Sequence, residues 1–238
     1  MLFRSRRTTR CCWWAADPGG PTFIGHYALG FAAKRLAPRT SLATLFLAAT
    51  LADLLWPVFL LLGWERVTVV PGTNPLLTLT FDSYPISHSL LTLVAWATLF
   101  AVLYQARTGY ARGALVVAPL VVSHWLLDYL THRPDMPLYP GGQTVGLGLW
   151  SSVAGTIIVE GLMFVAGVAI YVTTTRPRDP AGSYVLWGLV AVLAASYVAS
   201  LFSPPPPSLR ALAIGGIVFG WLFVGWAGWG DAHREAVT

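Results

Sequence analysis

Three residues that can carry charge or bind a metal recur along one apolar stretch of the chain. His124, Asp128 and His132 stand four residues apart in VVSHWLLDYLTHRPD, residues 121–135. A helix completes one turn every 3.6 residues, so this spacing predicts one helical face on which imidazole, carboxylate and imidazole are stacked. Such groups can together bind a divalent cation or transfer protons. Which chemistry they perform depends on the surroundings of the helix.

The composition is typical of an integral membrane protein. Of the 238 residues, 55% are hydrophobic and 11% are charged, whereas soluble domains carry about 25% charged residues. The 11 tryptophans suit a boundary between lipid and water. The formal net charge of +5 comes from arginines at the ends of apolar segments, which indicates orientation in a membrane rather than nucleic-acid binding. We therefore expect no nucleic-acid partner.

We predict an all-α fold, a polytopic bundle of membrane helices. About 20 apolar residues cross a hydrocarbon core, and six runs reach this length: 41–63, 86–106, 112–131, 149–173, 184–202 and 209–229. A shorter helix at 22–37, spanning or re-entrant, precedes them and ends before Pro38. We divide the chain into a basic, disordered extension (1–21), a helical bundle that holds the site (22–175) and a two-helix scaffold (176–238).

The basic residues and two glycines predict the orientation and the packing of the helices. Of the 15 Lys and Arg residues, only Arg66, Arg133 and Arg210 fall on one side of the predicted bundle. The positive-inside rule places the other side, with the C-terminus, in the cytoplasm. In the last run, Gly216 and Gly220 have the GxxxG spacing that allows helices to approach closely. This helix could serve as scaffold or as the contact of a homo-oligomer.

Six ionisable residues lie within the apolar segments. At about 1.5 Å of rise per residue, they lie roughly 18 to 28 Å from the cytoplasmic ends of their segments, in one layer in the outer half of the membrane. Ionisable groups are costly there and indicate function. Imidazoles and carboxylates are the ligand types of zinc, manganese and iron(II) sites. We therefore predict a divalent metal ion, zinc before manganese or iron, among His26, Asp53, His88, His124, Asp128 and Glu160.

Several of these residues have a second interpretation. His26 or His88 could simply donate a hydrogen bond between helices. Glu160 could be protonated and donate to a carbonyl without a catalytic role. His132 lies just before the helix-ending Pro134, so we expect a surface residue or a substrate contact there rather than a ligand.

The motifs around these residues resemble a bacterial integral-membrane family, the membrane-bound metal-dependent hydrolases (YdjM-like). The similar stretches are GHYALG (25–30), DLLWP (53–57), SHSLL (87–91) and SHWLLDYLTHRPD (123–135), so the resemblance covers about residues 24–140. It implies a bacterial inner-membrane location and a ligand set of His26, Asp53, His88, His124 and Asp128. Asp53 stands alone where many relatives carry a paired-acid PDxD motif, which favours one ion over two.

These features together predict a hydrolase that acts on a lipid or lipid-linked ester, amide or phosphoester near the outer leaflet. A bound ion would lower the pKa of water, and Glu160 or an uncoordinated Asp53 would be the general base. Arg66 and Arg133 could hold a phosphate or carboxylate headgroup, or anchor the chain at the interface. Two alternatives stay open: an ion- or proton-coupled transporter that uses the same layer, and a non-catalytic scaffold stabilised by metal.

Overall fold

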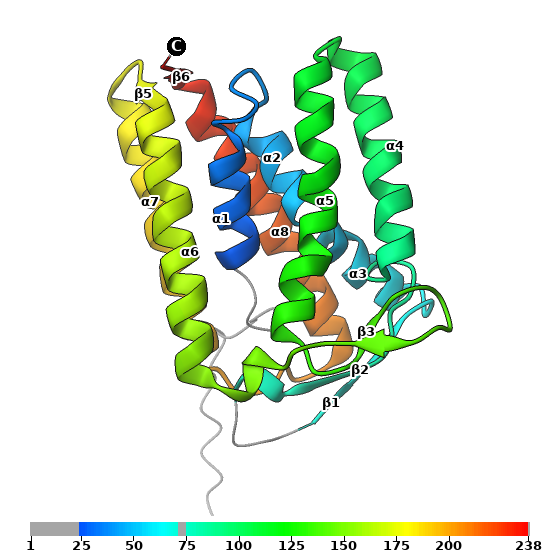
Figure 1. Cartoon of the computed structure of the whole chain (residues 1–238). Coiled ribbons are helices and arrows are strands. Elements are labelled where there is room, and N and C mark those ends of the chain that lie inside the picture. The colour runs from blue at the N-terminus through cyan, green and yellow to red at the C-terminus, as the bar shows by residue number, and fades with distance from the viewer. Residues whose placement is uncertain (1–23, 71–74, 238) are drawn as a thin grey trace, which may run out of the picture.

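The computed structural model describes residues 24–70 and 75–237, and the predicted extension 1–21 lies outside them. The described chain is mostly helical (Figure 1). Its α-helices are α1 (Ile24–Ala33), α2 (Leu42–Ala49), α3 (Leu51–Leu61), α4 (Leu90–Thr108), α5 (Ala111–Thr131), α6 (Val153–Thr174), α7 (Pro180–Ser200) and α8 (Leu209–Ala232). Short antiparallel strands pair as β1 (Arg66–Val69) with β2 (Leu79–Ser83), β3 (Met136–Pro137) with β4 (Thr144–Val145), and β5 (Thr175–Pro177) with β6 (Arg234–Ala236). The short 3-10 turns η1 (Pro75–Leu77) and η2 (Leu149–Ser151) precede β2 and α6.

Within the described residues, the five helices α4 to α8 are long and apolar enough to cross a membrane. They correspond to the last five predicted runs, with bounds that differ by at most four residues. The differences have local causes, because the side chains of Ser89, Ser152 and Asp179 accept hydrogen bonds from backbone N–H groups and so fix where α4, α6 and α7 begin. These helices are consistent with a multi-pass membrane protein.

The first predicted run, residues 41–63, is not one continuous helix, and a sixth span stays a prediction. The segment forms α2 and α3, which meet at Thr50 with a bend of 57°, as in a broken span or a re-entrant loop. At Thr50 the backbone leaves helical geometry, with φ −112° and ψ 17°. The Thr50 hydroxyl donates to the carbonyl oxygen of Phe46, a local bond that commonly bends helices.

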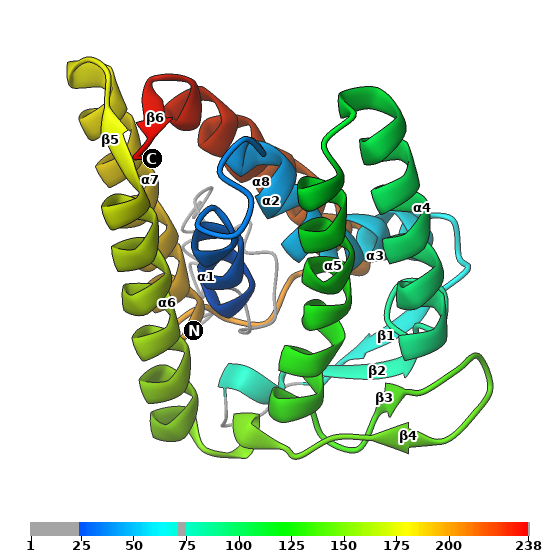
Figure 2. The ribbon, with the colours of Figure 1, turned by 45° about the horizontal axis from the view of Figure 1, so that its top comes forward.

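The short predicted N-terminal helix is α1, which begins at Ile24 and ends at Ala33. Ten residues rise only about 15 Å, so α1 is too short to cross a membrane alone. It lies between α5 and α6 (Figure 2), and eight of its ten residues are buried. The helix α6 comes very close, since a Cβ on Gly167 would lie 2.3 Å from the carbonyl oxygen of Ala28.

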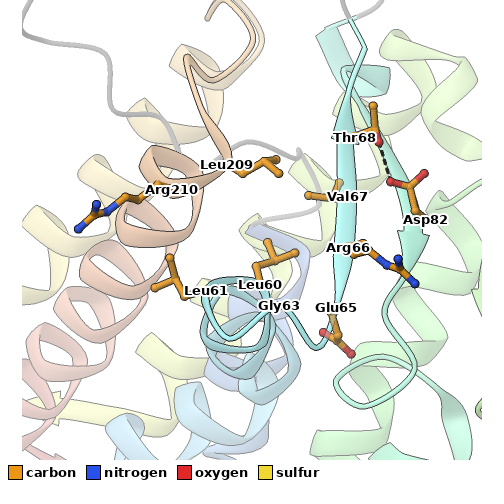
Figure 3. A pocket seen from close by; sticks show the side chains of 10 residues that line it. All are labelled: Leu60, Leu61, Gly63, Glu65, Arg66, Val67, Thr68, Asp82, Leu209 and Arg210. Atoms are coloured by element: carbon orange, nitrogen blue, oxygen red, sulfur yellow. Dashed lines mark hydrogen bonds between the residues drawn. The ribbon is translucent and has the colours of Figure 1, made fainter.

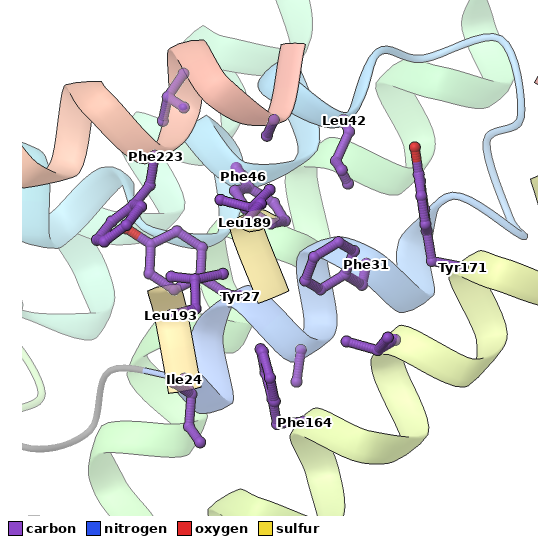
Figure 4. Packing of buried hydrophobic residues seen from close by; sticks show 14 of the residues in the cluster. Ile24, Tyr27, Phe31, Leu42, Phe46, Phe164, Tyr171, Leu189, Leu193 and Phe223 are labelled. Atoms are coloured by element: carbon purple, nitrogen blue, oxygen red, sulfur yellow. The ribbon is translucent and has the colours of Figure 1, made fainter. Parts of the chain in front are cut away.

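Two hydrophobic clusters hold the helices together. The first joins α1 to α6, α7 and α8, with Phe31, Tyr171 and Phe223 among its buried aromatic side chains (Figure 4). The second joins α4 and α5 to α2, α3 and the β1–β2 hairpin. The clusters meet where α1, α2 and α5 pack on one another. The outward faces carry exposed apolar side chains such as Leu103 and Leu162, as expected of a surface that contacts lipid.

The GxxxG face of α8 packs inside the chain, against α3. A Cβ on Gly216 would lie 3.4 Å from Pro57, and a Cβ on Gly220 would lie 2.5 Å from Leu54. The glycine spacing therefore serves close packing within one chain, and a homo-oligomer stays a prediction. Because α8 also packs against α2, the predicted C-terminal scaffold and the predicted site bundle share one core.

Candidate metal centre

Histidine and aspartate side chains from four segments meet inside the bundle. They are His26 in the first turn of α1, Asp53 in the first turn of α3, His88 directly before the N-cap of α4, and His124 with Asp128 on one face of α5. Two overlapping groups have donor atoms within 4.8 Å of one another: His26, His124 and Asp128, and Asp53, His88 and His124. All five residues in the predicted ligand set are therefore close together.

Four distances between donor atoms of the cluster have the length expected between ligands of one metal ion. Nε2 of His88 lies 3.7 Å from Oδ1 of Asp53 and 3.7 Å from Oδ2 of Asp128. Nε2 of His124 lies 3.6 and 3.2 Å from the same two oxygens. Zinc binds nitrogen and oxygen at about 2.0–2.2 Å, so neighbouring ligand atoms around it lie roughly 3.3–3.6 Å apart. The donor types and these four distances fit ligands of a divalent ion, with Asp128 in one of the two groups of donor atoms and Asp53 with His88 in the other.

The bend between α2 and α3 orients His124. Its Nδ1 lies 2.9 Å from the carbonyl oxygen of Ala49, the last residue of α2. A carbonyl oxygen only accepts, so Nδ1 carries the proton and Nε2 directs its lone pair at the cluster. A backbone carbonyl is a common second partner of metal-binding histidines. The break in the helix thus contributes directly to the geometry of the centre.

Ser87, the first residue of the SHSLL stretch, and Glu65, which the sequence did not mark, form a chain of hydrogen bonds next to His88. Oγ of Ser87 lies 2.7 Å from Nδ1 of His88 and donates to Oε2 of Glu65 at 2.6 Å. Glu65 is only 1% exposed. In the sequence it follows an apolar run as part of GWER, where a charged residue is ordinary, so no local signal distinguishes it from a surface glutamate.

His26 lies against both residues that α5 contributes. Its Nε2 is 3.2 Å from Oδ1 of Asp128, and its ring stacks on that of His124 with centroids 3.8 Å apart and planes 9° apart. An ionised carboxylate only accepts, so Nε2 of His26 donates in this contact. A nitrogen that donates offers no lone pair to an ion. His26 therefore holds Asp128 in this arrangement, and with His124 and Asp128 it also forms one of the two groups of donor atoms.

Asp53 forms the accessible side of the cluster. Its side chain is 46% exposed, whereas the side chains of His88, His124 and Asp128 are 5%, 0% and 3% exposed. Structural metal sites are closed by four protein ligands, and catalytic sites keep one position open to water or substrate. Among the donors of the cluster, Asp53 on α3 is therefore the most exposed.

Glu160 lies beside the cluster rather than in it. It is 2% exposed and extends from α6 toward the start of α1. A Cβ on Gly25 would lie 3.8 Å from its Oε2. Glu160 belongs to neither group of donor atoms found in the described residues. It is thus a buried carboxylate beside Gly25, the residue before His26.

His132 is buried, so its interpretation as a surface residue was wrong. It is 4% exposed, and its ring packs against Trp150 with centroids 4.1 Å apart. Nδ1 of His132 donates to Asp135 at 3.0 Å, and the hydroxyl of Tyr84 donates to the same carboxylate. Burial, together with the Asp135 carboxylate, raises the pKa of Tyr84, so its phenol stays a donor. These contacts hold the C-terminal end of α5 against Tyr84 and Trp150.

The two predicted arginines have different surroundings. Arg133 donates to the carbonyl oxygen of Leu79 at 3.2 Å and so ties β2 to the end of α5. Arg66 lines a cavity of about 760 Å³ between the end of α3, the β1–β2 hairpin and the start of α8 (Figure 3). Leu60 and Leu209 also line it. Arg66 is therefore the better placed of the two to meet an anionic group.

Comparisons of the chain with protein-family models, with curated proteins and with solved structures found no match. What the centre does has to be argued from its own geometry.

Proposed function

We propose that the protein is a membrane-embedded, metal-dependent hydrolase. The observation that carries this proposal is a buried cluster of imidazole and carboxylate donors, with neighbouring donor atoms 3.2–3.7 Å apart and one accessible side at Asp53. A closed structural site would not leave one carboxylate half exposed. The resemblance of the GH, SHS and SHxxxD motifs to the membrane-bound metal-dependent hydrolases supports the same conclusion.

The proposed cofactor is one divalent ion held by His88, His124 and Asp128, with Asp53 uncoordinated on the accessible side. A mixed imidazole and carboxylate set suits zinc first, and manganese or iron(II) next. Such an ion would polarise a carbonyl or phosphoryl group and would lower the pKa of bound water, so that hydroxide could form and attack near neutral pH. Asp53 and Glu160 are the carboxylates proposed to accept the proton from that water. Asp53 has the accessible position, and Glu160 is its buried alternative.

The proposed substrate is a lipid or lipid-linked ester, amide or phosphoester. The excess of basic residues at the end that holds the α4–α5 turn and β5–β6 favours a cytoplasmic position for that end. The hairpin end then faces outward, and the donor cluster is nearest to the outer leaflet. Arg66, in the cavity beside α3, is the residue proposed to attract an anionic headgroup.

One observation favours a second candidate, an ion-coupled transporter. The broken helix formed by α2 and α3 is bent by 57° next to the cluster, and both Ala49 and Asp53 flank the break. Transporters commonly bind ions at such breaks. Among the described residues, however, this is the one bent pair, and transporter folds built from repeats carry two.

The test combines metal content with catalysis. Purified protein in detergent is analysed by mass spectrometry for wild type and for Asp128→Asn, with Asp82→Asn, a change on the β1–β2 hairpin, as the control. We expect about one ion per chain in wild type and in the control, and none in Asp128→Asn. Reconstituted protein is then assayed for cleavage of ester, amide and phosphoester lipids, where Glu160→Gln is expected to retain metal and to lose rate.

Two results would overturn the proposal. Wild type without stoichiometric metal removes the centre itself. Metal uptake into proteoliposomes with no cleavage of any lipid, and with loss of uptake in Asp128→Asn, replaces the hydrolase with the transporter.

A further inference from the structure

Glu65 has no part in the proposed reaction, yet it is a nearly fully buried carboxylate close to the centre. It stands between α3 and β1, at the wall of the cavity that also holds Arg66 (Figure 3). Its Oε1 accepts from the backbone N–H groups of Ile86 and Ser87, both at 2.8 Å. Its Oε2 accepts from the hydroxyl of Ser87 at 2.6 Å. All of these bonds lie in the segment that carries His88.

We propose that Glu65 and Ser87 are positioning residues that fix the tautomer of His88 so that its Nε2 is free to bind the metal. This inference rests on the metal centre proposed above. It assigns roles to two residues that do not contact the ion.

The direction of the hydrogen bonds follows from the number of protons. The hydroxyl of Ser87 has one hydrogen, which it donates to Glu65. At 2.7 Å from Nδ1 of His88, the same oxygen can then only accept, so Nδ1 carries the proton. A neutral imidazole has one N–H, which leaves the lone pair on Nε2. That atom lies 3.7 Å from carboxylate oxygens of both Asp53 and Asp128.

His88 and His124 reach the same tautomer by different means. His124 donates to the backbone carbonyl of Ala49. A backbone carbonyl always accepts, so no side-chain substitution reverses the direction of this hydrogen bond. His88 depends on a serine, which can donate or accept, and so its tautomer depends on the group behind that serine. An ionised carboxylate only accepts and sets one direction. An amide in its place would donate to Ser87 and reverse the direction.

Glu65→Gln is therefore the decisive variant. The amide oxygen can still accept from the backbone N–H groups of Ile86 and Ser87, while its NH₂ group donates to the hydroxyl of Ser87. The hydroxyl then turns toward His88, whose proton moves to Nε2. We expect metal affinity to fall about 10- to 100-fold, as for other partners behind metal ligands. Asp82→Asn is the matched control, because Asp82 is a carboxylate on the β1–β2 hairpin whose Oδ2 accepts from the hydroxyl of Thr68 at 2.6 Å.

The tautomer is read from ¹⁵N NMR of histidine-labelled, metal-free protein in nanodiscs, with His88 assigned by its absence in His88→Gln. We expect protonated Nδ1 in wild type and in Asp82→Asn, and protonated Nε2 in Glu65→Gln. Zinc titration of the same samples then gives the affinities. If Glu65→Gln does not fold, Ser87→Ala takes its place, with loss of the fixed tautomer and weaker zinc binding expected.

The outcomes separate this inference from the proposed reaction. An unchanged His88 tautomer with unchanged zinc affinity in the variant overturns it. A wild type that binds no zinc overturns both proposals. A wild type that binds zinc and cleaves no lipid, with the expected tautomer change in Glu65→Gln, supports the positioning role and removes only the hydrolase.

Discussion

Asp128 is the residue on which the centre depends most, because both of its oxygens are used. Oδ1 accepts from His26 at 3.2 Å. Oδ2 lies 3.2 Å from His124 and 3.7 Å from His88. A carboxylate held on one oxygen presents the other in a fixed direction, which is how residues behind a ligand improve metal affinity. His26 and Asp128 should therefore respond differently to substitution.

We expect Asp128→Asn to lose the ion and His26→Ala to keep it with lower affinity. The amide removes a charged ligand, whereas loss of His26 removes only the donor that orients Asp128. Partners of this kind contribute about 10- to 100-fold in affinity, or roughly 1.4 to 2.8 kcal/mol. Titration against a coloured chelator measures both variants. Complete loss of metal in His26→Ala would instead make His26 a ligand, as the family resemblance implies.

At the scale of the elements, the features that could be predicted from the sequence were those that follow from the helical repeat. The spacing of His124 and Asp128 places both on one face of α5 because any helix has that repeat. The bend at Thr50 was not predictable in this way, since residues 41–63 are apolar on both sides of it. The role of Glu65 was also hidden, because it arises from a contact with Ser87, 22 residues away. Burial and long-range hydrogen bonds do not appear in a local pattern.

The position of α1 depends on how closely α6 approaches it. A Cβ on Gly167 would meet the backbone of Ala28 at 2.3 Å, and a backbone cannot move aside as a side chain can. Gly161 lies on the same helix, and a Cβ there would meet nothing within 4 Å. The two glycines therefore form a matched pair for testing the contact between α1 and α6.

We expect Gly167→Ala to destabilise the protein by about 1–3 kcal/mol, as overpacking does, and to weaken metal binding, because α1 carries His26. Gly161→Ala should be neutral, or stabilising by up to about 1 kcal/mol through helix propensity. Unfolding free energies in mixed micelles and metal titrations measure the two effects. Equal behaviour of the two variants would show that α1 does not need this close contact.

At the scale of the whole molecule, Asp231 joins the start and the end of the described chain. Its Oδ2 accepts from Nζ of Lys34 at 2.7 Å and from the backbone N–H of Leu42 at 3.0 Å, and its Oδ1 accepts from Tyr171 at 2.7 Å. The carboxylate thus connects α8 to the α1–α2 turn and to α6. The C-terminal end of α8, which carries Asp231, lies near the β5–β6 pair, at the end of the bundle opposite the hairpin β1–β2 (Figure 1).

Because this contact is buried, we expect it to matter far more than a surface ion pair. The side chains of Lys34 and Asp231 are 7% and 8% exposed, so Asp231→Asn leaves a buried cation without its partner and should cost about 3–5 kcal/mol. Glu235→Gln is the control, since Glu235 pairs with Arg176 while their side chains are 38% and 70% exposed, and such pairs contribute less than about 1 kcal/mol.

The double change Lys34→Met with Asp231→Leu separates charge from packing. Apolar residues of similar size often replace a buried ion pair at little cost, so the double variant should unfold with a free energy closer to wild type than Asp231→Asn. Thermal unfolding in detergent measures all three variants. If the double variant is as unstable as Asp231→Asn, the bonds to Leu42 and Tyr171, rather than the charge of Lys34, hold α1 and α2 in the place where the metal centre needs them.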